Sequence, residues 1–552
     1  MLDALWKTGT IVLLLGGLVF FHELGHFLVA KLFRVKVLKF SLGFGPRILG
    51  FRKGETQYQV AALPLGGFVR MAGESPEDDV GPEDEHRTFL NQSPWKRSLI
   101  ALAGPAMNLV FPLFAFFAAY MISHQTPAAR VGELDPDLPA GRAGLRAGDR
   151  LVAIDGVPVT YFLDIPAQVA PKYDQPIRID FEREGVVRQI TVTPIRDEED
   201  DVLEKKVAGK IGISPDGPTS VVGVPDPKSP AAKAGLQTFD RVVSVAGAAV
   251  HDFTGLTAGI SKQTGPFELI VLRETDLGLP GAAATRWQVL KVTVAPGFVE
   301  DPEHGRVARI GIETDQPYLF SVRPDSAAEK AGLRRGDRLV AVDGSAISGW
   351  MSFDRKLRAL APNGGHFELT YSRDGATRKT EVQLKKETWT DQMDREVTKF
   401  TFGAEADLHR APPELIPISP GAAARWSTYE TGDWIKKTAL VLVGLVQGHI
   451  SPKTIGGPLM LMDIAVTAAE AGSAQYLQAM AIISVSLGMM NVLPIPVLDG
   501  FHVMAALFEM IRRRPLPARV REVATYVGLG LLATLMIVVF KNDFFRYFVN
   551  SK

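Results

Sequence analysis

Residues that can bind a metal lie near the start of the chain, in the stretch Phe20–Phe27 (Phe-Phe-His-Glu-Leu-Gly-His-Phe). On a helix, His22 and His26 are one turn apart on the same face, so both imidazoles can bind one zinc ion. Glu23 is then beside the metal and can act as general base toward a water molecule. Three ionisable side chains in so apolar a segment are costly in lipid, and they therefore indicate a functional site.

A third zinc ligand must be a histidine or a carboxylate, because the chain contains no cysteine. The stretch 490–500 (Met-Asn-Val-Leu-Pro-Ile-Pro-Val-Leu-Asp-Gly) follows an apolar run, and its two prolines exclude a regular helix. Irregular backbone at membrane depth requires a protein-lined cavity. Here Asp499 can complete the three protein ligands of a catalytic zinc. His502 is the rival ligand or a supporting residue, and Asn491 presents an amide in the same stretch.

Four apolar segments are long enough to span a bilayer. They are residues 9–32, 98–122, 476–498 and 523–540. The first is expected to be a retained helix, because no small-residue cleavage site follows it. The second contains Asn108, which either bonds to a neighbouring helix or supports catalysis. A shorter apolar stretch, 438–446, follows Trp434 and two lysines and is expected to lie in the membrane interface.

Basic residues gather beside three of the spans, which predicts that these flanks face the cytoplasm. They are Lys31, Arg34, Lys36, Lys39, Lys96, Arg97, Arg512, Arg513, Arg514, Arg519 and Arg521. With four spans, both termini and the segment 124–433 then lie on the opposite side. Because His26 is near the cytoplasmic end of its helix, the metal is expected nearer that face.

The segment between the first two spans, Val35–Met71, is predicted to form a β-hairpin. Residues 57–60 alternate in polarity, and Gly50–Gly54 has the composition of a turn. The strands are too apolar for a solvent loop, so the hairpin is expected to be associated with the membrane, where other protein segments must cover its backbone. The acidic stretch 75–86 after it is expected to be a surface loop.

The segment 124–433 contains an internal repeat in three copies, at 138–156, 229–247 and 325–344. Each copy predicts a short helix, a Gly-Leu turn and a strand, and the three units resemble PDZ domains of the bacterial type. Such domains bind extended peptides by strand addition, although a copy can also be a spacer without a ligand. The second copy has Thr238-Phe239 where the third has Arg335-Gly336, so its turn is expected to differ.

These motifs together resemble the site-2 protease family of intramembrane zinc metalloproteases, over nearly the whole chain. The resemblance implies zinc bound by His22, His26 and Asp499, with Glu23 as base and Asn491 holding the substrate or the oxyanion. It also implies a single-pass membrane protein substrate that another protease has already trimmed, such as an anti-sigma factor. It further implies a bacterial inner membrane location with the repeats in the periplasm and the active site toward the cytoplasm. The hairpin would correspond to the element of the family that pairs with the unwound substrate.

The expected fold is a polytopic α-helical membrane protein with four transmembrane helices, a membrane-associated β-hairpin and three inserted PDZ-like α+β domains. The expected domains are residues 1–125, 126–222, 223–315, 316–415 and 416–552. The repeats are expected to act as a substrate size filter. Phe501 departs from the family pattern, which usually has a second Gly there.

Two other functions remain open. One is a catalytically inactive PDZ scaffold, against which the intact set of His, Glu and Asp argues. The other is a metal transporter, but the spans show no paired repeat around a midplane site. Lys plus Arg and Asp plus Glu both total 61, so nothing in the charge balance indicates a nucleic-acid partner. The partners expected are the substrate, membrane lipid and peptides bound by the repeats.

Overall fold

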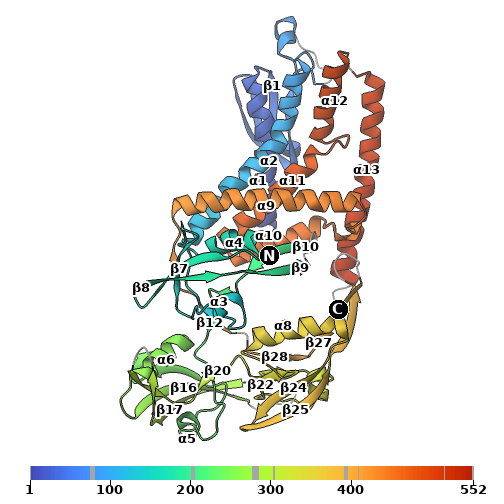
Figure 1. Ribbon diagram of the computed structural model, residues 1–552. Coiled ribbons are helices and arrows are strands. Elements are labelled where there is room, and N and C mark those ends of the chain that lie inside the picture. Colours follow the sequence, from blue (N-terminus) through green and yellow to red (C-terminus); the bar gives the residue numbers. More distant parts are fainter. Residues whose placement is uncertain are drawn as a thin grey trace. The chain divides into compact units, whose positions relative to one another are not determined.

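The computed structural model describes residues 2–74, 81–200, 205–276, 285–301, 305–390, 396–407, 409–514 and 516–549. The chain forms two compact units (Figure 1). The helical unit consists of residues 1–125, 390–395 and 417–552, and the inserted unit of residues 126–389 and 396–416. Part of the predicted acidic loop, residues 75–80, lies outside the described residues, and Pro82–Arg87 forms a 3-10 helix.

The helical unit is built from seven α-helices among its described residues. They are α1 (Leu2–Leu32), α2 (Pro94–Ser123), α9 (Pro420–Val446), α10 (Pro458–Ala471), α11 (Ser473–Val492), α12 (Asp499–Arg512) and α13 (Ala518–Phe544). Its largest core forms where α1, α2, α10 and α11 meet, around Leu14, Leu18, Phe111 and Met480. The apolar faces of these helices therefore pack on one another close to the predicted metal ligands.

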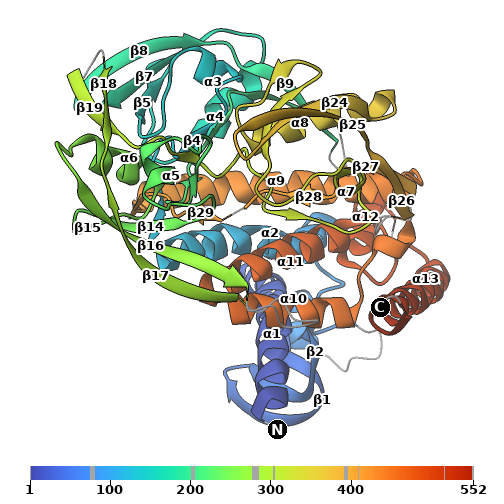
Figure 2. The same ribbon diagram turned by 90° about the horizontal axis from the view of Figure 1, so that it is seen from below.

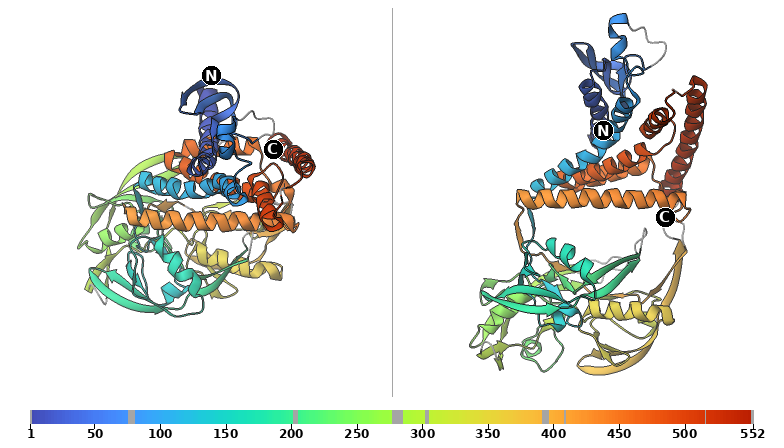
Figure 3. Two further views of the ribbon diagram at one scale, coloured as in Figure 1. Left: turned by 90° about the horizontal axis from the view of Figure 1, so that it is seen from above. Right: turned by 45° about the horizontal axis from the view of Figure 1, so that its top comes forward.

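Three described helices are long and apolar enough to cross a membrane: Trp6–Leu32, Pro94–Ser123 and Arg519–Phe548. They coincide with three of the four predicted spans. The remaining one, predicted at 476–498, corresponds to α11, which ends at Val492 because prolines follow. The predicted interfacial stretch 438–446 is the end of α9, which runs unbroken over 27 residues (Figure 3).

The hairpin consists of two long strands, β1 (Val37–Lys53) and β2 (Thr56–Met71), joined at Gly54. Both strands bend, so that each pairs with the other in two places. Residues 37–42 of β1 lie between residues 57–60 and residues 67–71 of β2, and residues 47–53 pair on the far side of residues 56–61. The segment 67–71 is thus an edge strand, paired on one side only among the described residues.

The inserted unit repeats one arrangement three times. Each copy has a four-stranded antiparallel sheet, with strand orders β6-β5-β7-β8, β15-β14-β16-β17 and β23-β22-β24-β25. Figures 1 and 2 show the three sheets as separate bodies. Three buried cores accompany them, drawn from residues 129–211, 222–310 and 319–404. Each repeat thus buries a core of its own, as the internal repeat of the sequence predicts.

The helices and strands follow one another in the same order in the three copies. The first has β4 (Glu133–Leu134), α3 (Pro139–Arg142), β5 (Arg150–Ile154), β6 (Val157–Pro158), α4 (Asp164–Val169), β7 (Ile177–Arg183), β8 (Val186–Val192), β9 (Ile195–Asp200), β10 (Lys205–Lys210) and β11 (Ile213–Ser214). The second has β13 (Val222–Gly223), α5 (Pro230–Lys233), β14 (Arg241–Val245), β15 (Ala248–Ala249), α6 (Phe253–Ser261), β16 (Phe267–Asp276), β17 (Thr285–Val294), β18 (Gly297–Asp301), β19 (Gly305–Arg309) and β20 (Glu313–Thr314). The third has β21 (Ser321–Val322), α7 (Ala327–Lys330), β22 (Arg338–Val342), β23 (Ser345–Ala346), α8 (Trp350–Leu360), β24 (His366–Arg373), β25 (Ala376–Gln383), β26 (Lys385–Thr390), β27 (Glu396–Thr401) and β28 (Ala404–Glu405).

The repeated Asp-Arg dipeptide has a structural role in each copy. Asp149, Asp240 and Asp337 are almost fully buried. Each accepts a backbone hydrogen bond within its own turn, as Asp337 does from Arg334 at 2.8 Å. Each also binds an arginine from the neighbouring strand, as Asp337 binds Arg373 at 2.6 and 2.7 Å. The buried charge is therefore paired and hydrogen-bonded, as burial requires.

The prediction that the turn of the second copy differs is wrong. Phe239 has a φ of +74°, close to the +94° of Gly148 and the +89° of Gly336 in the other copies. The Phe239 ring lies 4.6 Å from the Arg335 guanidinium of the third repeat, which also lies 4.1 Å from the Phe320 ring. Phe239 thus adopts a backbone conformation that usually requires glycine, and its ring stacks on an arginine of the next repeat.

Candidate metal centre

The three predicted zinc ligands come together in the helical unit. His22 and His26 project from one face of α1, with their Nε2 atoms 3.3 Å apart. Oδ2 of Asp499 lies 3.1 Å from Nε2 of His22 and 3.5 Å from Nε2 of His26. Among the described residues, these three form the one group of potential ligands whose atoms all lie within 4.8 Å of one another. Two imidazoles and a carboxylate fit a catalytic zinc, which keeps its fourth position open.

The ring of His26 is held by α2. Its Nδ1 donates to the backbone carbonyl of Ile100 at 2.8 Å, so in the neutral ring Nε2 has no proton and can bind a metal. The two helices are very close here, because a β-carbon at Gly104 would lie 2.2 Å from Nε2 of His26. One at Gly25 would lie 2.2 Å from the carbonyl oxygen of Ala103. Small residues thus let α1 and α2 meet at the ligand ring, as in other membrane helix pairs.

Asp499 is positioned by the break between α11 and α12. The chain leaves α11 at Val492, turns through Pro494, and begins α12 at Asp499 itself. The N-terminus of a helix favours a carboxylate. Val497 has a φ of +88°, which is strained for a β-branched residue and lies two residues from the ligand. A β-carbon at Gly500 would lie 2.2 Å from the carbonyl oxygen of Val492, so the two helices meet tightly.

Glu23 lies between the ligand ring and the hairpin. It follows His22 on α1 and is partly buried. A β-carbon at Gly67, in the edge segment of β2, would lie 3.0 Å from Cγ of Glu23. The edge strand therefore passes beside the predicted base.

Of the other predicted residues, only Asn108 has a hydrogen-bond contact with a ligand among the described residues. The side-chain amide of Asn108, in α2, lies 3.1 Å from Nδ1 of His22. Asn491 is in the last turn of α11 and is partly buried. His502, in α12, is outside the group of three ligands, and its ring lies 6.0 Å from that of Phe501.

Sequence reasoning missed several residues that position the ligands. Ile100 supplies only a backbone carbonyl, so nothing in its side chain could have indicated the role. Ser484 of α11 donates to the carbonyl oxygen of Asn108 at 2.8 Å. Gly25 lies between the two histidines in the sequence, and this position was the one available signal.

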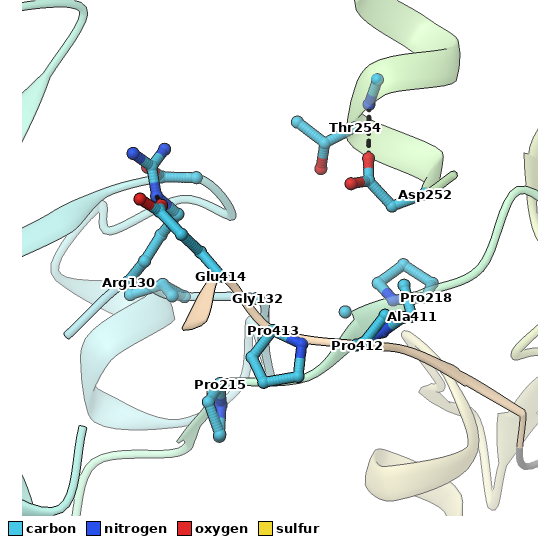
Figure 4. A pocket seen from close by; sticks show the side chains of 14 residues that line it. Arg130, Gly132, Pro215, Pro218, Asp252, Thr254, Ala411, Pro412, Pro413 and Glu414 are labelled. Atoms are coloured by element: carbon cyan, nitrogen blue, oxygen red, sulfur yellow. Dashed lines mark hydrogen bonds and ion pairs between the residues drawn. The ribbon is translucent and has the colours of Figure 1, made fainter. Parts of the chain in front are cut away.

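A separate pocket of about 410 Å³ lies in the inserted unit (Figure 4). Four prolines line it: Pro215, Pro218, Pro412 and Pro413. Its charged groups already have partners, because Arg130 binds Glu414 at 2.7 Å and Asp252 accepts from the backbone of Gly255 at 2.6 Å. The pocket therefore offers no ligand set comparable with that of the helical unit.

Comparison with known proteins identifies the family. A family model described as peptidase family M50 matches residues 10–535. The chain belongs to peptidase family M50. It is a membrane zinc metalloprotease, and its apolar helices and bacterial relatives place it in a bacterial inner membrane.

The M50 chain is similar to curated proteins along almost its whole length. It is 28% identical over 563 residues to the regulator of sigma-E protease of Escherichia coli, with 99% of this chain and 100% of the relative covered. It is 27% identical over 567 residues to the same protease of Salmonella typhimurium, with the same coverage. A Neisseria meningitidis protein named as a candidate zinc metalloprotease is 29% identical over 541 residues, with 96% of each chain covered.

Among solved structures, the M50 chain is similar to the PDZ domain of an SdrC-like protein from Listeria monocytogenes. The identity is 21% and the TM-score is 0.14, with 16% of this chain and 86% of that structure covered.

Proposed function

We propose that this M50 protease cuts the membrane-spanning segment of a single-pass protein that another protease has already trimmed. The observation that carries the proposal is the ring of His22, His26 and Asp499, which lies among apolar helices rather than on a soluble domain. The relatives named as regulators of sigma-E favour an anti-sigma factor as the substrate class.

His22, His26 and Asp499 would hold zinc, which supplies Lewis acidity toward a peptide carbonyl when it is bound. Glu23 accepts the proton of the attacking water and passes it to the leaving amine. Asn491 is placed at the end of α11 and would donate to the substrate or to the developing oxyanion. His502 would be a supporting residue beside the ligands, and the ring of Phe501 lies 6.0 Å from its own.

The hairpin would hold the unwound substrate. A transmembrane helix hides its amides in its own hydrogen bonds, so it must open before water can attack. The edge segment 67–71 pairs with another strand on one side only among the described residues, although the Met71 amide donates to Glu74 at 3.1 Å. Its first residue, Gly67, is beside Glu23. Addition of a substrate strand there would replace the lost hydrogen bonds and bring a peptide bond to the base.

The proposed topology has four transmembrane helices. The fourth is α11, which is not among the three described helices that are long and apolar enough to cross a membrane. The break after Val492 explains its shortness, because irregular backbone at membrane depth is tolerated where protein lines a cavity. The basic flanks favour a cytoplasmic position for 33–95 and 510–522, and 124–433 would then be in the periplasm. The hairpin would lie at the membrane, and lipid would contact α13 where no other part of the protein covers it.

The three repeats would be PDZ-like domains with the boundaries 126–222, 223–315 and 316–415. We favour a steric role for them. Three folded bodies inserted between the spans would exclude any substrate that still carries a large extracytoplasmic domain. The alternative is that one groove binds the new C-terminus of the trimmed substrate and recruits it.

Deletion of residues 126–415 separates the two roles. β3 (Gln125–Pro127) pairs with β30 (Leu415–Pro417), so the ends are adjacent and a short flexible linker can join them. The filter predicts that the deleted protein cuts trimmed substrate and begins to cut untrimmed substrate. Recruitment predicts loss of cleavage of trimmed substrate. The same deletion carrying Glu23→Gln is the control, and it should cut neither.

A further inference from the structure

Nδ1 of His22 faces a side chain that can either donate or accept a hydrogen bond. Asn108 is fully buried, and its amide lies 3.1 Å from Nδ1 of His22. Its backbone is fixed, because Ser484 donates to its carbonyl oxygen at 2.8 Å. A β-carbon at Gly488 would lie 3.1 Å from Cβ of Asn108, so α11 closes over this residue. Contacts with α11 therefore hold Asn108 in place beside His22.

Two arrangements of protons satisfy the contacts of His22. In the first, Nε2 carries the proton and faces Oδ2 of Asp499 at 3.1 Å, while Nδ1 accepts from the Asn108 amide nitrogen. In the second, Nδ1 carries the proton and donates to the Asn108 amide oxygen, and Nε2 is free to bind a metal. A half-turn of the amide interconverts them. Only the second is compatible with zinc on Nε2.

The amide oxygen of Asn108 is available for this second arrangement. With the nitrogen facing His22, Oδ1 is buried and has no hydrogen-bond partner among the described residues. A buried acceptor without a partner is unusual and calls for an explanation. The acceptor role toward Nδ1 of His22 is one use for this atom.

The two histidines differ in the group that faces Nδ1. Nδ1 of His26 faces the backbone carbonyl of Ile100, which can only accept, so the neutral His26 ring carries its proton on Nδ1 and presents Nε2 to a metal. His22 faces an amide that allows both forms. We propose that Asn108 is a positioning residue for the metal, which holds His22 in the zinc-binding form by presenting Oδ1 to Nδ1. This inference rests on the proposed zinc site.

The test is zinc affinity of the purified full-length chain, measured by competition with a chromophoric chelator. Asn108→Leu has a similar volume and no polar atom, whereas Asn108→Asp can only accept. We expect Asn108→Leu to weaken zinc binding about 10- to 100-fold. Asn108→Asp should bind zinc within about threefold of the native chain or more tightly, because carboxylate–histidine–metal arrangements stabilise the same proton position.

Two controls separate a proton role from packing. Asn108→Ala removes both the bulk and the acceptor and replaces Asn108→Leu if that variant does not fold. Ser484→Ala removes the bond to the backbone of Asn108 but leaves its amide, and it should bind zinc nearly as the native chain does. Thermal unfolding in excess chelator shows whether each variant folds without the metal, so that a loss of zinc affinity can be told from a loss of folding.

The outcomes distinguish this inference from the proposed function. Equal losses of zinc affinity in Asn108→Asp and Asn108→Leu would overturn it, as would unchanged affinity in Asn108→Leu. If excess zinc restores cleavage by Asn108→Leu, the residue acts through the metal, as we expect. If the native chain binds no zinc, or if His26→Ala retains it, the zinc site itself is wrong and the inference fails with it.

Discussion

A β-carbon on Gly104 would lie 2.2 Å from Nε2 of His26, so the backbone of α2 leaves room for this ring only if residue 104 has no side chain. Gly104→Ala should push the imidazole from its place and lower zinc affinity by at least about tenfold, with a parallel fall in cleavage. Chelator competition measures the first effect. Gly16→Ala on α1 is the control, because nothing lies within 4 Å of its added carbon. Unchanged zinc affinity in Gly104→Ala would contradict the geometry.

The contact between Phe239 and Arg335 predicts an unusual order of stabilities. Phe239→Ala loses the ring contacts and keeps the strained φ of +74°, so it should cost about 1–2 kcal/mol. Phe239→Gly loses the same contacts but removes the strain, so it should be about 1 kcal/mol less destabilising. Thermal unfolding of the full chain measures both.

A matched control isolates the backbone contribution. Gly336→Ala adds a side chain at the equivalent position of the third repeat, with a φ of +89° and nothing within 4 Å. It should cost about 1 kcal/mol through backbone strain alone. If Phe239→Gly were less stable than Phe239→Ala, strain at this turn would not be the explanation.

Asp315 predicts a pH dependence in the inserted unit. Burial, and then the carboxylate of Asp407, raise the pKa of Asp315 to about 7, although Arg410 partly offsets this and Glu133 adds to it. The folded form therefore holds a proton that the unfolded chain releases near its ordinary pKa of about 4. Stability from this group is fully present below that value and is lost as the pH rises toward about 7, by about 1.4 kcal/mol for each unit.

Asp315→Asn removes this titration. Its melting temperature should exceed that of the native chain at about pH 8, and the gap should narrow toward about pH 5. Thermal unfolding across this range measures the gap. A gap that is constant with pH, or that widens toward acid, would show that Asp315 does not titrate in this way.

The proposed topology can be tested with single cysteines, because the chain has none of its own. Lys53→Cys and Ser345→Cys are both at exposed positions, one at the end of β1 and the other in the third repeat. After the outer envelope is made permeable, an impermeant thiol reagent should label only Ser345→Cys. Both should react in detergent. Labelling of Lys53→Cys alone would mean that the orientation is reversed.

The spacing of His22 and His26 made their shared face predictable, because an α-helix places residues four apart on one side. Asp499 could be proposed from its chemistry, but its distance from the histidines depends on how α12 begins after the proline turn. The edge strand at 67–71 was not predictable, because it results from bends that make β1 and β2 pair twice. Phe239 misled the prediction, since contacts between repeats outweighed a local preference for glycine.

The helices of the C-terminal part were less predictable than those at the start. The full length of α9 was missed, because its first half carries charged and aromatic residues that weaken the apolar signal. α10 was not predicted, and the two glycines before it, Gly456 and Gly457, are residues that more often mark a turn than the start of a helix. Its start is capped by a residue far away in the sequence, Asp543 of α13. Asp543 accepts hydrogen bonds from the backbone N–H of Gly457 at 2.9 Å and of Leu459 at 2.8 Å.

The central claim is that His22, His26 and Asp499 hold a zinc ion beside a base that is not a ligand. The most direct test is zinc content and cleavage of a model transmembrane peptide, measured together on purified variants. The native chain should hold about one zinc. Glu23→Gln should keep the zinc and lose cleavage, whereas His22→Ala and Asp499→Ala should lose both. Full zinc content and cleavage in Asp499→Ala would contradict the ligand set and make His502 the next candidate, and loss of zinc in Glu23→Gln would contradict its role as a base.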